Sequence, residues 1–189
     1  MYDNWEQLED DAKQCRRCKL CQTRNNVVFG VGNKEADLMF IGEGPGADED
    51  KQGEPFVGKA GKLMNMAFEV IGLDRNEVYI ANIVKCRPPS NRNPQEDEAD
   101  ACLNYLRNQV ILVKPKIIVL LGSVALKNIL GKIEIPIHSN KVEGYPQDKV
   151  LYLNIQDNEM SGFRIMEGDL AFAHLVNEVS NNGIFLVEY

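Results

Sequence analysis

A short apolar run that ends in a glycine-rich turn is the feature that most limits how this chain can fold. Residues 38–41 read Leu-Met-Phe-Ile, and the turn Gly-Glu-Gly-Pro-Gly follows directly at residues 42–46. Four apolar residues bounded by a turn are typical of a buried strand, and glycines let the backbone approach a ligand closely. In open α/β sheets, ligands bind outside the carboxyl ends of the strands. The stretch therefore predicts an α/β sheet with a binding site at this turn.

Strand-like and helix-like patterns alternate along the rest of the chain. Apolar runs predict further strands at residues 78–84, 116–121 and 150–153, and an added edge strand at residues 184–187. Helical spacing of apolar or small residues predicts helices at residues 5–14, from Gly58 to Gly72, and at residues 95–113, 123–130 and 167–179. Alternation of this kind favours right-handed crossovers and a parallel sheet. We therefore expect a single domain, residues 1–189, with three α/β/α layers and a central four-stranded parallel sheet.

Charge and hydropathy limit the partners of the chain. No apolar run approaches the roughly 20 residues that span a bilayer, and the N-terminus is acidic, so we expect a cytoplasmic protein without a membrane partner. The net charge of -7 argues against a general nucleic-acid coat protein, because phosphate binding depends on lysine and arginine. Any DNA contact must therefore be local. Basic residues at 16, 17, 19, 24, 85, 87 and 92 either supply such contacts or form solvated surface.

The five cysteines favour metal ligation or free thiols over a disulfide framework, since the chain shows no export signal. Cys15 and Cys18 form a Cys-x2-Cys pair of the kind that chelates zinc or an iron–sulfur cluster. Such a pair needs two more ligands, and we assign Cys86, on a proline-rich loop, and Cys102, on the helix predicted after it. Cys21 is left over and is interpreted as a free thiol.

Residues 42–61, GEGPGADEDKQGEPFVGKAG, resemble the first motif of the family-four uracil-DNA glycosylases, the iron–sulfur members of the uracil-DNA glycosylase superfamily. The cysteines at 15, 18, 86 and 102 match the pattern by which that family holds a [4Fe-4S] cluster. Hydrolysis of a glycosidic bond needs no electron transfer, so the resemblance implies a structural cluster. It would fasten the N-terminal segment to the loop of Cys86 and the helix of Cys102. Zinc remains the alternative, because both centres accept four thiolates.

The same resemblance implies roles for six residues of the expected site. Glu43 would position or activate the attacking water, with Asn91 as a second, assisting catalytic residue. Phe56 would stack on the extruded base, and Asn82 would read its edge, since one amide offers both a donor and an acceptor. The substrate-binding set is Gly42, Gly44, Phe56 and Asn82. Taken singly, Glu43 is better explained as a solvated loop carboxylate and Phe56 as a core aromatic, but the two together at motif spacing favour the functional reading.

The resemblance runs from Met1 to about Leu130 and fails over residues 131–189. Family members carry a histidine after the fourth strand, followed by proline and a small residue, and this histidine donates to the uracil oxygen. Residues 153–164 contain no histidine, and neither His138 nor His174 stands in its place. Asn154 or Gln156 could supply a neutral donor, a hypothesis that rests on position alone.

We therefore expect a uracil-DNA glycosylase that hydrolyses the N-glycosidic bond of uracil in DNA and starts base excision repair. Its expected partner is uracil-containing DNA, single- or double-stranded, and its expected state is a monomer. One alternative is a catalytically weak or inactive iron–sulfur relative that binds DNA and lacks the second-motif histidine. Another is a zinc-stapled α/β domain that acts on a different small ligand.

Overall fold

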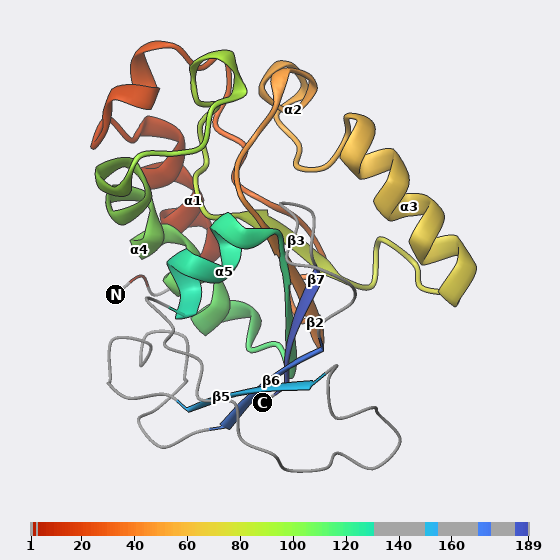
Figure 1. The fold of residues 1–189 in the computed structure, drawn as a ribbon. Coiled ribbons are helices and arrows are strands. Elements are labelled where there is room, and N and C mark those ends of the chain that lie inside the picture. Colours follow the sequence, from red (N-terminus) through yellow and green to blue (C-terminus); the bar gives the residue numbers. More distant parts are fainter. Residues whose placement is uncertain (1, 3, 131–149, 155–169, 175–183, 189) are drawn as a thin grey trace.

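The computed structural model describes residues 2, 4–130, 150–154, 170–174 and 184–188. Its centre is a five-stranded sheet in the order β1-β3-β2-β4-β7 (Figure 1). The strands are β1 (Val31–Gly32), β2 (Leu38–Gly42), β3 (Tyr79–Asn82), β4 (Ile117–Leu121) and β7 (Ile184–Glu188). β2 pairs in parallel with both β3 and β4, whereas β1 and β7 are antiparallel strands at the two edges. The α/β class and the added edge strand are confirmed.

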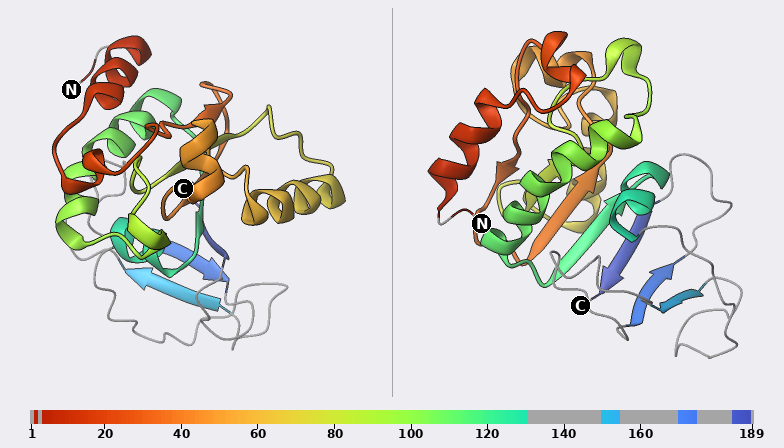
Figure 2. Two further views of the ribbon diagram at one scale, coloured as in Figure 1. Left: turned by 90° about the horizontal axis from the view of Figure 1, so that it is seen from above. Right: turned by 90° about the vertical axis from the view of Figure 1, so that its left-hand side faces the viewer.

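Helices cover both faces of this sheet. On one side lie α1 (Trp5–Gln14), α4 (Glu96–Val113) and α5 (Ser123–Leu130), and on the other lies α3 (Lys59–Ile71) (Figures 1 and 2). Alternate residues of β2 serve the two layers, as the two-residue period of a strand requires: Met39 and Ile41 join the core under α1 and α4, and Phe40 joins the core under α3. Short helices occupy the loops: η1 (Lys19–Gln22), α2 (Ala47–Gln52) and η2 (Pro89–Asn91).

The apolar spacing that predicts α3 puts Leu63, Met66, Ala67, Val70 and Ile71 on its buried face, but the structure exposes all five. Gly61, Met64 and Phe68 face the sheet. Leu63, Met66, Val70 and Ile71 are exposed by 61–86%. The helix begins after Gly58 and ends at Gly72, whose left-handed φ of 71° suits glycine, so the predicted boundaries hold although the buried face differs.

Two predictions for the C-terminal part need correction. β5 (Val150–Asn154) forms where a strand is expected, but it pairs antiparallel with β6 (Leu170–His174) in a separate two-stranded sheet. The place beside β4 is held by β7, which pairs with all five residues of β4. β6 also replaces part of the helix expected at residues 167–179, so His174 ends a strand. The register sets Tyr152 opposite Phe172.

None of the helices within the described segments is both long enough and apolar enough to cross a membrane.

Candidate functional site

Two parallel strands end side by side at the expected binding turn. The register places Gly42, the last residue of β2, beside Asn82, the last residue of β3. The chain segments that follow stay paired: the Ile83 N–H donates to the Gly42 carbonyl at 2.8 Å, and the Val84 N–H donates to the Glu43 carbonyl at 3.1 Å. The carboxyl edge of the sheet therefore carries two loops held in a fixed relation to each other.

Phe56 and Asn82 converge on the backbone of Gly42. A Cβ atom at Gly42 would lie 2.5 Å from Phe56 Cζ and 2.6 Å from Asn82 Oδ1. Such distances are closer than van der Waals contact, so only glycine leaves room for both side chains. Gly42, Phe56 and Asn82, three residues assigned from the sequence that lie on separate parts of the chain, thus share one small space.

Asn82 is buried with half of its amide unsatisfied. Its side chain is 2% exposed, and its Oδ1 has no hydrogen-bond partner among the described residues. Buried side-chain oxygens are nearly always hydrogen-bonded, and an unpaired one costs about 1–3 kcal/mol. An acceptor kept buried at that cost, beside an aromatic ring, suits a ligand that donates a hydrogen bond.

Glu43 and Gly44 follow Gly42 on the same loop. Glu43 is half-buried, and burial raises the pKa of its carboxyl group. A Cβ atom at Gly44 would lie 2.7 Å from Val84 Cγ2 and would approach Pro88, so this loop packs closely on the loop after β3. The two loops together form the rim of the space at Gly42.

Asn91 lies on η2 and is exposed. Its Oδ1 accepts a hydrogen bond from Arg87 Nε at 2.8 Å. Asn91 and its neighbour Ser90 both adopt a φ of 55°, which is uncommon for residues with a Cβ atom. Within the described part of the chain, Phe56 and Asn82 meet at Gly42, whereas the side-chain partner of Asn91 is Arg87, so Asn91 is assigned to the loop that forms the rim.

Glu43→Gln is expected to raise the melting temperature of the protein at neutral pH. Because burial raises the pKa of Glu43, the folded state holds this proton more tightly than the unfolded chain does. Ionisation above the ordinary value of 4.5 therefore lowers the free energy of unfolding, and glutamine avoids that loss. Thermal unfolding followed by circular dichroism should show a difference that disappears as the pH falls below 4.5. The same change at the exposed Glu35 is the control, and a lower melting temperature for Glu43→Gln at neutral pH contradicts the prediction.

Glu49, on α2, fixes the loop that carries Phe56. Its buried carboxylate accepts hydrogen bonds from the backbone N–H groups of Gly46 at 3.1 Å, Val57 at 3.0 Å and Gly58 at 2.7 Å. Phe56 itself has a φ of 54°, a conformation that needs support from its surroundings. The acidic stretch at residues 48–50 thus includes a carboxylate with a structural role, Glu49, which the sequence alone does not distinguish from a site carboxylate.

Glu49→Gln is expected to lower the free energy of unfolding by about 1–3 kcal/mol. The amide keeps one acceptor oxygen and presents an NH₂ group to a backbone N–H, so at least one of the three donors loses its partner. Urea unfolding measures the effect. Glu54→Gln, at an exposed position, is the matched control. Equal urea midpoints for the two variants would rule out the stabilising role of Glu49.

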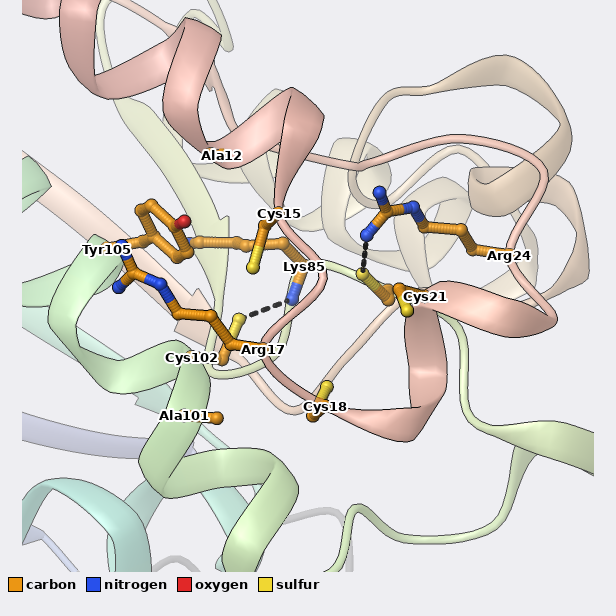
Figure 3. Close-up of a pocket in the computed structure, with 11 residues that line it drawn as sticks. Ala12, Cys15, Arg17, Cys18, Cys21, Arg24, Lys85, Ala101, Cys102 and Tyr105 are labelled. Carbon is orange, nitrogen blue, oxygen red and sulfur yellow. Dashed lines mark hydrogen bonds between the residues drawn. The ribbon is translucent and has the colours of Figure 1, made fainter.

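A second pocket gathers all five cysteines (Figure 3). Cys15 directly follows α1, Cys18 precedes η1, Cys86 lies on the loop after β3, and Cys102 lies on α4. Figure 3 shows the thiols of Cys15, Cys18 and Cys102 pointing into the same space. Cys21, which the sequence analysis interprets as a free thiol, lies on η1 and also lines this pocket.

Nitrogen donors contact two of these sulfurs. The backbone N–H of Lys85 donates to Cys102 Sγ at 3.2 Å, and Arg24 Nη1 donates to Cys86 Sγ at 3.1 Å (Figure 3). Burial raises the pKa of the Cys102 thiol to about 12 and also raises the pKa of Cys86. Thiols in this setting hold their protons until a cation replaces them, so ligation releases protons.

The five thiols line one pocket but do not form a compact metal site. Among the described residues, no group of three or more cysteine, histidine or acidic side chains has the arrangement of a site for a metal ion. A single zinc ion takes four sulfurs at about 2.3 Å. A [4Fe-4S] cluster binds each thiolate through a different iron atom and therefore needs a wider ring. The donor set, with N–H groups at two sulfurs, fits a cluster in this respect.

Several basic residues have structural partners instead of free surface positions. Lys85 is 1% exposed, and burial lowers its pKa to about 8. Arg92 forms a two-point contact with the buried Glu98 at 2.7 and 2.8 Å. Arg17 binds Asp11 at 2.9 Å and lies over the ring of Tyr105. Of the basic residues named from the sequence, Lys85 is neither solvated surface nor a DNA contact.

The residues considered as replacements for the missing histidine lie either at the ends of described strands or outside the described residues. Asn154 is the last residue of β5, and His174 is the last residue of β6. Gln156 and His138 lie outside the described residues.

Comparison with known proteins gives one consistent family. The family model of the Uracil DNA glycosylase superfamily matches residues 29–167. The type-4 uracil-DNA glycosylase of Sulfurisphaera tokodaii is 50% identical over 131 residues, a match that covers 69% of this chain and 60% of that protein. The type-4 enzyme of Saccharolobus solfataricus is 46% identical, over 75% of this chain and 67% of the relative. That of Thermotoga maritima is 43% identical, over 78% of each. The chain thus matches less than two thirds of the Sulfurisphaera protein.

Proposed function

This chain belongs to the type-4 branch of the uracil-DNA glycosylase superfamily, and we propose that it hydrolyses the N-glycosidic bond of uracil in DNA and so starts base excision repair. The observation that carries the proposal is the buried, unpartnered Asn82 Oδ1, which meets Phe56 at the backbone of Gly42. A pocket of this kind suits one flat, apolar-faced base with a hydrogen-bond donor on its edge.

Recognition of uracil follows from the chemistry of these groups. A base stacked in a duplex is out of reach, so it must first rotate out of the helix at a cost of a few kcal/mol. Phe56 then stacks on the base, and the Asn82 Oδ1 accepts the N3–H of uracil while the amide NH₂ donates to the carbonyl oxygen beside it. Cytosine presents an acceptor at N3 and an amino group beside it. Both would face a like group of Asn82, so cytosine is rejected.

Glu43 supplies the group that acts on water. Water attacks the C1′ carbon of the sugar, its proton passes to the Glu43 carboxylate, and the C1′–N1 bond breaks with its electron pair on uracil. The carboxylate must be ionised to accept this proton, and its raised pKa makes it a stronger base. The departing anion is stabilised by donors at the Asn82 end of the pocket, and such donors contribute about 10²–10³ in rate each. Asn91, on the rim of the site, is placed to assist through the sugar or phosphate.

Cys15, Cys18, Cys86 and Cys102 are the residues that we propose as ligands of a structural [4Fe-4S] cluster. When bound, the cluster supplies a covalent crosslink between the N-terminal segment, the loop after β3 and α4. Its support is that all four cysteines line one pocket, with N–H groups donating to Cys86 and Cys102. The loop of Cys86 continues into η2, so the same crosslink orders the rim of the uracil pocket.

Contacts with DNA have to come from a few cations, because the chain carries a net charge of -7. Arg16 and Lys19 are exposed on the cysteine-bearing segment, and Arg87 is half-exposed on the loop after β3. Within the described residues these three have accessible side chains and no ion pair to a carboxylate, whereas Arg24, which also lacks such an ion pair, donates to Cys86 Sγ and to the Lys13 carbonyl. We assign them to the phosphates on either side of the extruded base.

The decisive experiment is a cleavage assay on the purified, cluster-loaded protein. Incubation with single-stranded DNA that holds one uracil, followed by alkali, is expected to break the strand at that position and to leave strands with cytosine or thymine intact. DNA binding without strand breaks would instead favour the inactive relative. A colourless protein that contains zinc and no iron would favour the zinc-stapled domain.

A further inference from the structure

Lys85 connects the cysteine pocket with the strand that carries Asn82. Its backbone N–H faces the pocket and donates to Cys102 Sγ at 3.2 Å. Its side chain leads away from that sulfur (Figure 3). Its ammonium donates to the backbone carbonyl of Asn82 at 2.9 Å. One residue thus contacts a proposed cluster ligand through its main chain and the base-reading strand through its side chain.

The ammonium of Lys85 has a second fixed partner. It donates to Gln109 Oε1, on α4, at 2.6 Å. The amide of Gln109 in turn donates to the carbonyl of Phe29 at 2.9 Å and to the hydroxyl of Tyr79, on β3, at 3.0 Å. Gln109 and Tyr79 are 0% and 2% exposed. A buried chain of hydrogen bonds therefore clamps both ends of β3 to α4.

A fully buried lysine without a carboxylate is costly to keep. Within the described residues, Lys85 forms no ion pair, and its ammonium contacts only neutral oxygens. A methionine or leucine would fill the same space without that cost, because a buried charge needs strong compensation. Stability alone does not account for this residue.

We propose that Lys85 is a positioning residue for uracil recognition: it fixes the carbonyl of Asn82, and thereby the direction of the Asn82 side chain, relative to the cysteine pocket. The inference rests on the proposed function. The carbonyl of Asn82 ends β3, so the backbone there is held from the side by Lys85 while the next residue, Ile83, pairs with Gly42. Because the Asn82 Oδ1 has no hydrogen-bond partner among the described residues, the orientation of the Asn82 side chain depends on the position of its own backbone.

Lys85→Met removes the ammonium and keeps the length of the side chain. We expect the variant to bind iron as the wild type does, by metal analysis and visible absorbance, yet to lose about 10- to 100-fold in single-turnover uracil release and in affinity for free uracil, the range for a hydrogen bond to a charged group. Lys116→Met is the matched control. Lys116 is exposed, pairs with Asp37 at 2.7 Å and directly precedes β4, at the opposite edge of the sheet from the uracil pocket.

A double-mutant cycle separates positioning from a general loss of structure. If Lys85 acts through Asn82, Lys85→Met should slow single-turnover release by less than twofold in an Asn82→Ala background. A full 10- to 100-fold loss in that background would overturn the inference. So would a Lys85→Met enzyme within twofold of wild type, or one whose activity falls only in proportion to its iron content.

Gln109→Leu keeps the test decisive if Lys85→Met does not fold. It removes the second acceptor of the ammonium and leaves Asn82, Lys85 and the cysteines in place. A loss of uracil affinity at unchanged iron content supports the inference, and unchanged affinity overturns it. If the wild-type protein neither releases nor binds uracil, the proposed function itself is wrong. If the wild type releases uracil and the variants do so equally well, only the role of Lys85 is wrong.

Discussion

Asn82→Ala is expected to slow uracil release by about 10²–10³-fold while it changes the free energy of unfolding by less than about 1 kcal/mol. The loss in rate follows from removing the one side chain that offers both a donor and an acceptor to the base. The small change in stability follows from the unpartnered Oδ1: truncation deletes a buried acceptor that the folded protein leaves unsatisfied, and this gain offsets the lost packing. Truncation of a residue kept for stability would lower the free energy of unfolding and leave the rate of uracil release unchanged.

Asn108→Ala is the matched control for Asn82→Ala. Asn108 is 5% exposed, but its amide is satisfied: Oδ1 accepts from the Tyr2 N–H at 3.3 Å, and Nδ2 donates to the Asn104 carbonyl at 2.7 Å. We expect this variant to lose about 1–3 kcal/mol of stability and to keep its rate per folded molecule. Single-turnover release and urea unfolding, measured on both variants, give the comparison. If Asn82→Ala loses stability and retains its rate, Asn82 does not read the base.

The sequence predicts the first 130 residues well because their local signals agree with one another. The helix at residues 5–14 and the one between Gly58 and Gly72 match α1 and α3, and the apolar run at residues 116–121 includes the whole of β4. In each case glycine, a capping residue or a charge change marks the boundary. The exception is α2, six residues in a stretch of acidic and glycine residues, which no apolar period announces.

The strands of the C-terminal part show what a local pattern leaves open. A run such as residues 150–153 predicts a strand but not its partner. Pairing depends on which other strands of the chain compete for the free edge of the sheet beside β4. In the structure, β7 pairs with β4 in antiparallel register, and β5 pairs with β6. The segment at residues 170–174 alternates large and small residues, which fits a strand as well as it fits a helix. The choice between them is tertiary.

Contacts between distant residues explain why part of the site was missed. Gly42, Phe56 and Asn82 carry recognisable residue types on loops at the ends of strands, so sequence patterns single them out. Lys85 and Gln109 do not: a lysine in a basic loop reads as surface, and a glutamine on a helix reads as solvated. Their burial becomes apparent only when α4 packs on β3. The one sequence signal for the burial of Gln109 is its position three residues after Leu106, in a helix that buries residues on several of its sides.

Cys86→Ser is expected to abolish iron binding and to lower the melting temperature by about 10–20 °C. A structural metal centre contributes its binding free energy to folding, and a loss of about 5 kcal/mol corresponds to this shift in a chain of this size. Cys86 is 5% exposed and receives the hydrogen bond of Arg24, so serine leaves that donor with a weaker contact as well. Iron content, visible absorbance and thermal unfolding of the protein purified without air measure the effect.

Cys21→Ser in the same pocket separates the ligands from the remaining thiol. Cys21 lines the pocket with the other four, and Cys18-Lys-Leu-Cys21 is itself a Cys-x2-Cys pair. If Cys15 and Cys18 are the N-terminal ligands, Cys21→Ser keeps its iron and its melting temperature while Cys15→Ser loses both. The reverse result would transfer the ligand role to Cys18 and Cys21. The α1 segment would then have no crosslink of its own and would be held by its core packing and by contacts such as those of Asp11, Arg17 and Tyr105, and the crosslink would run from η1 to α4.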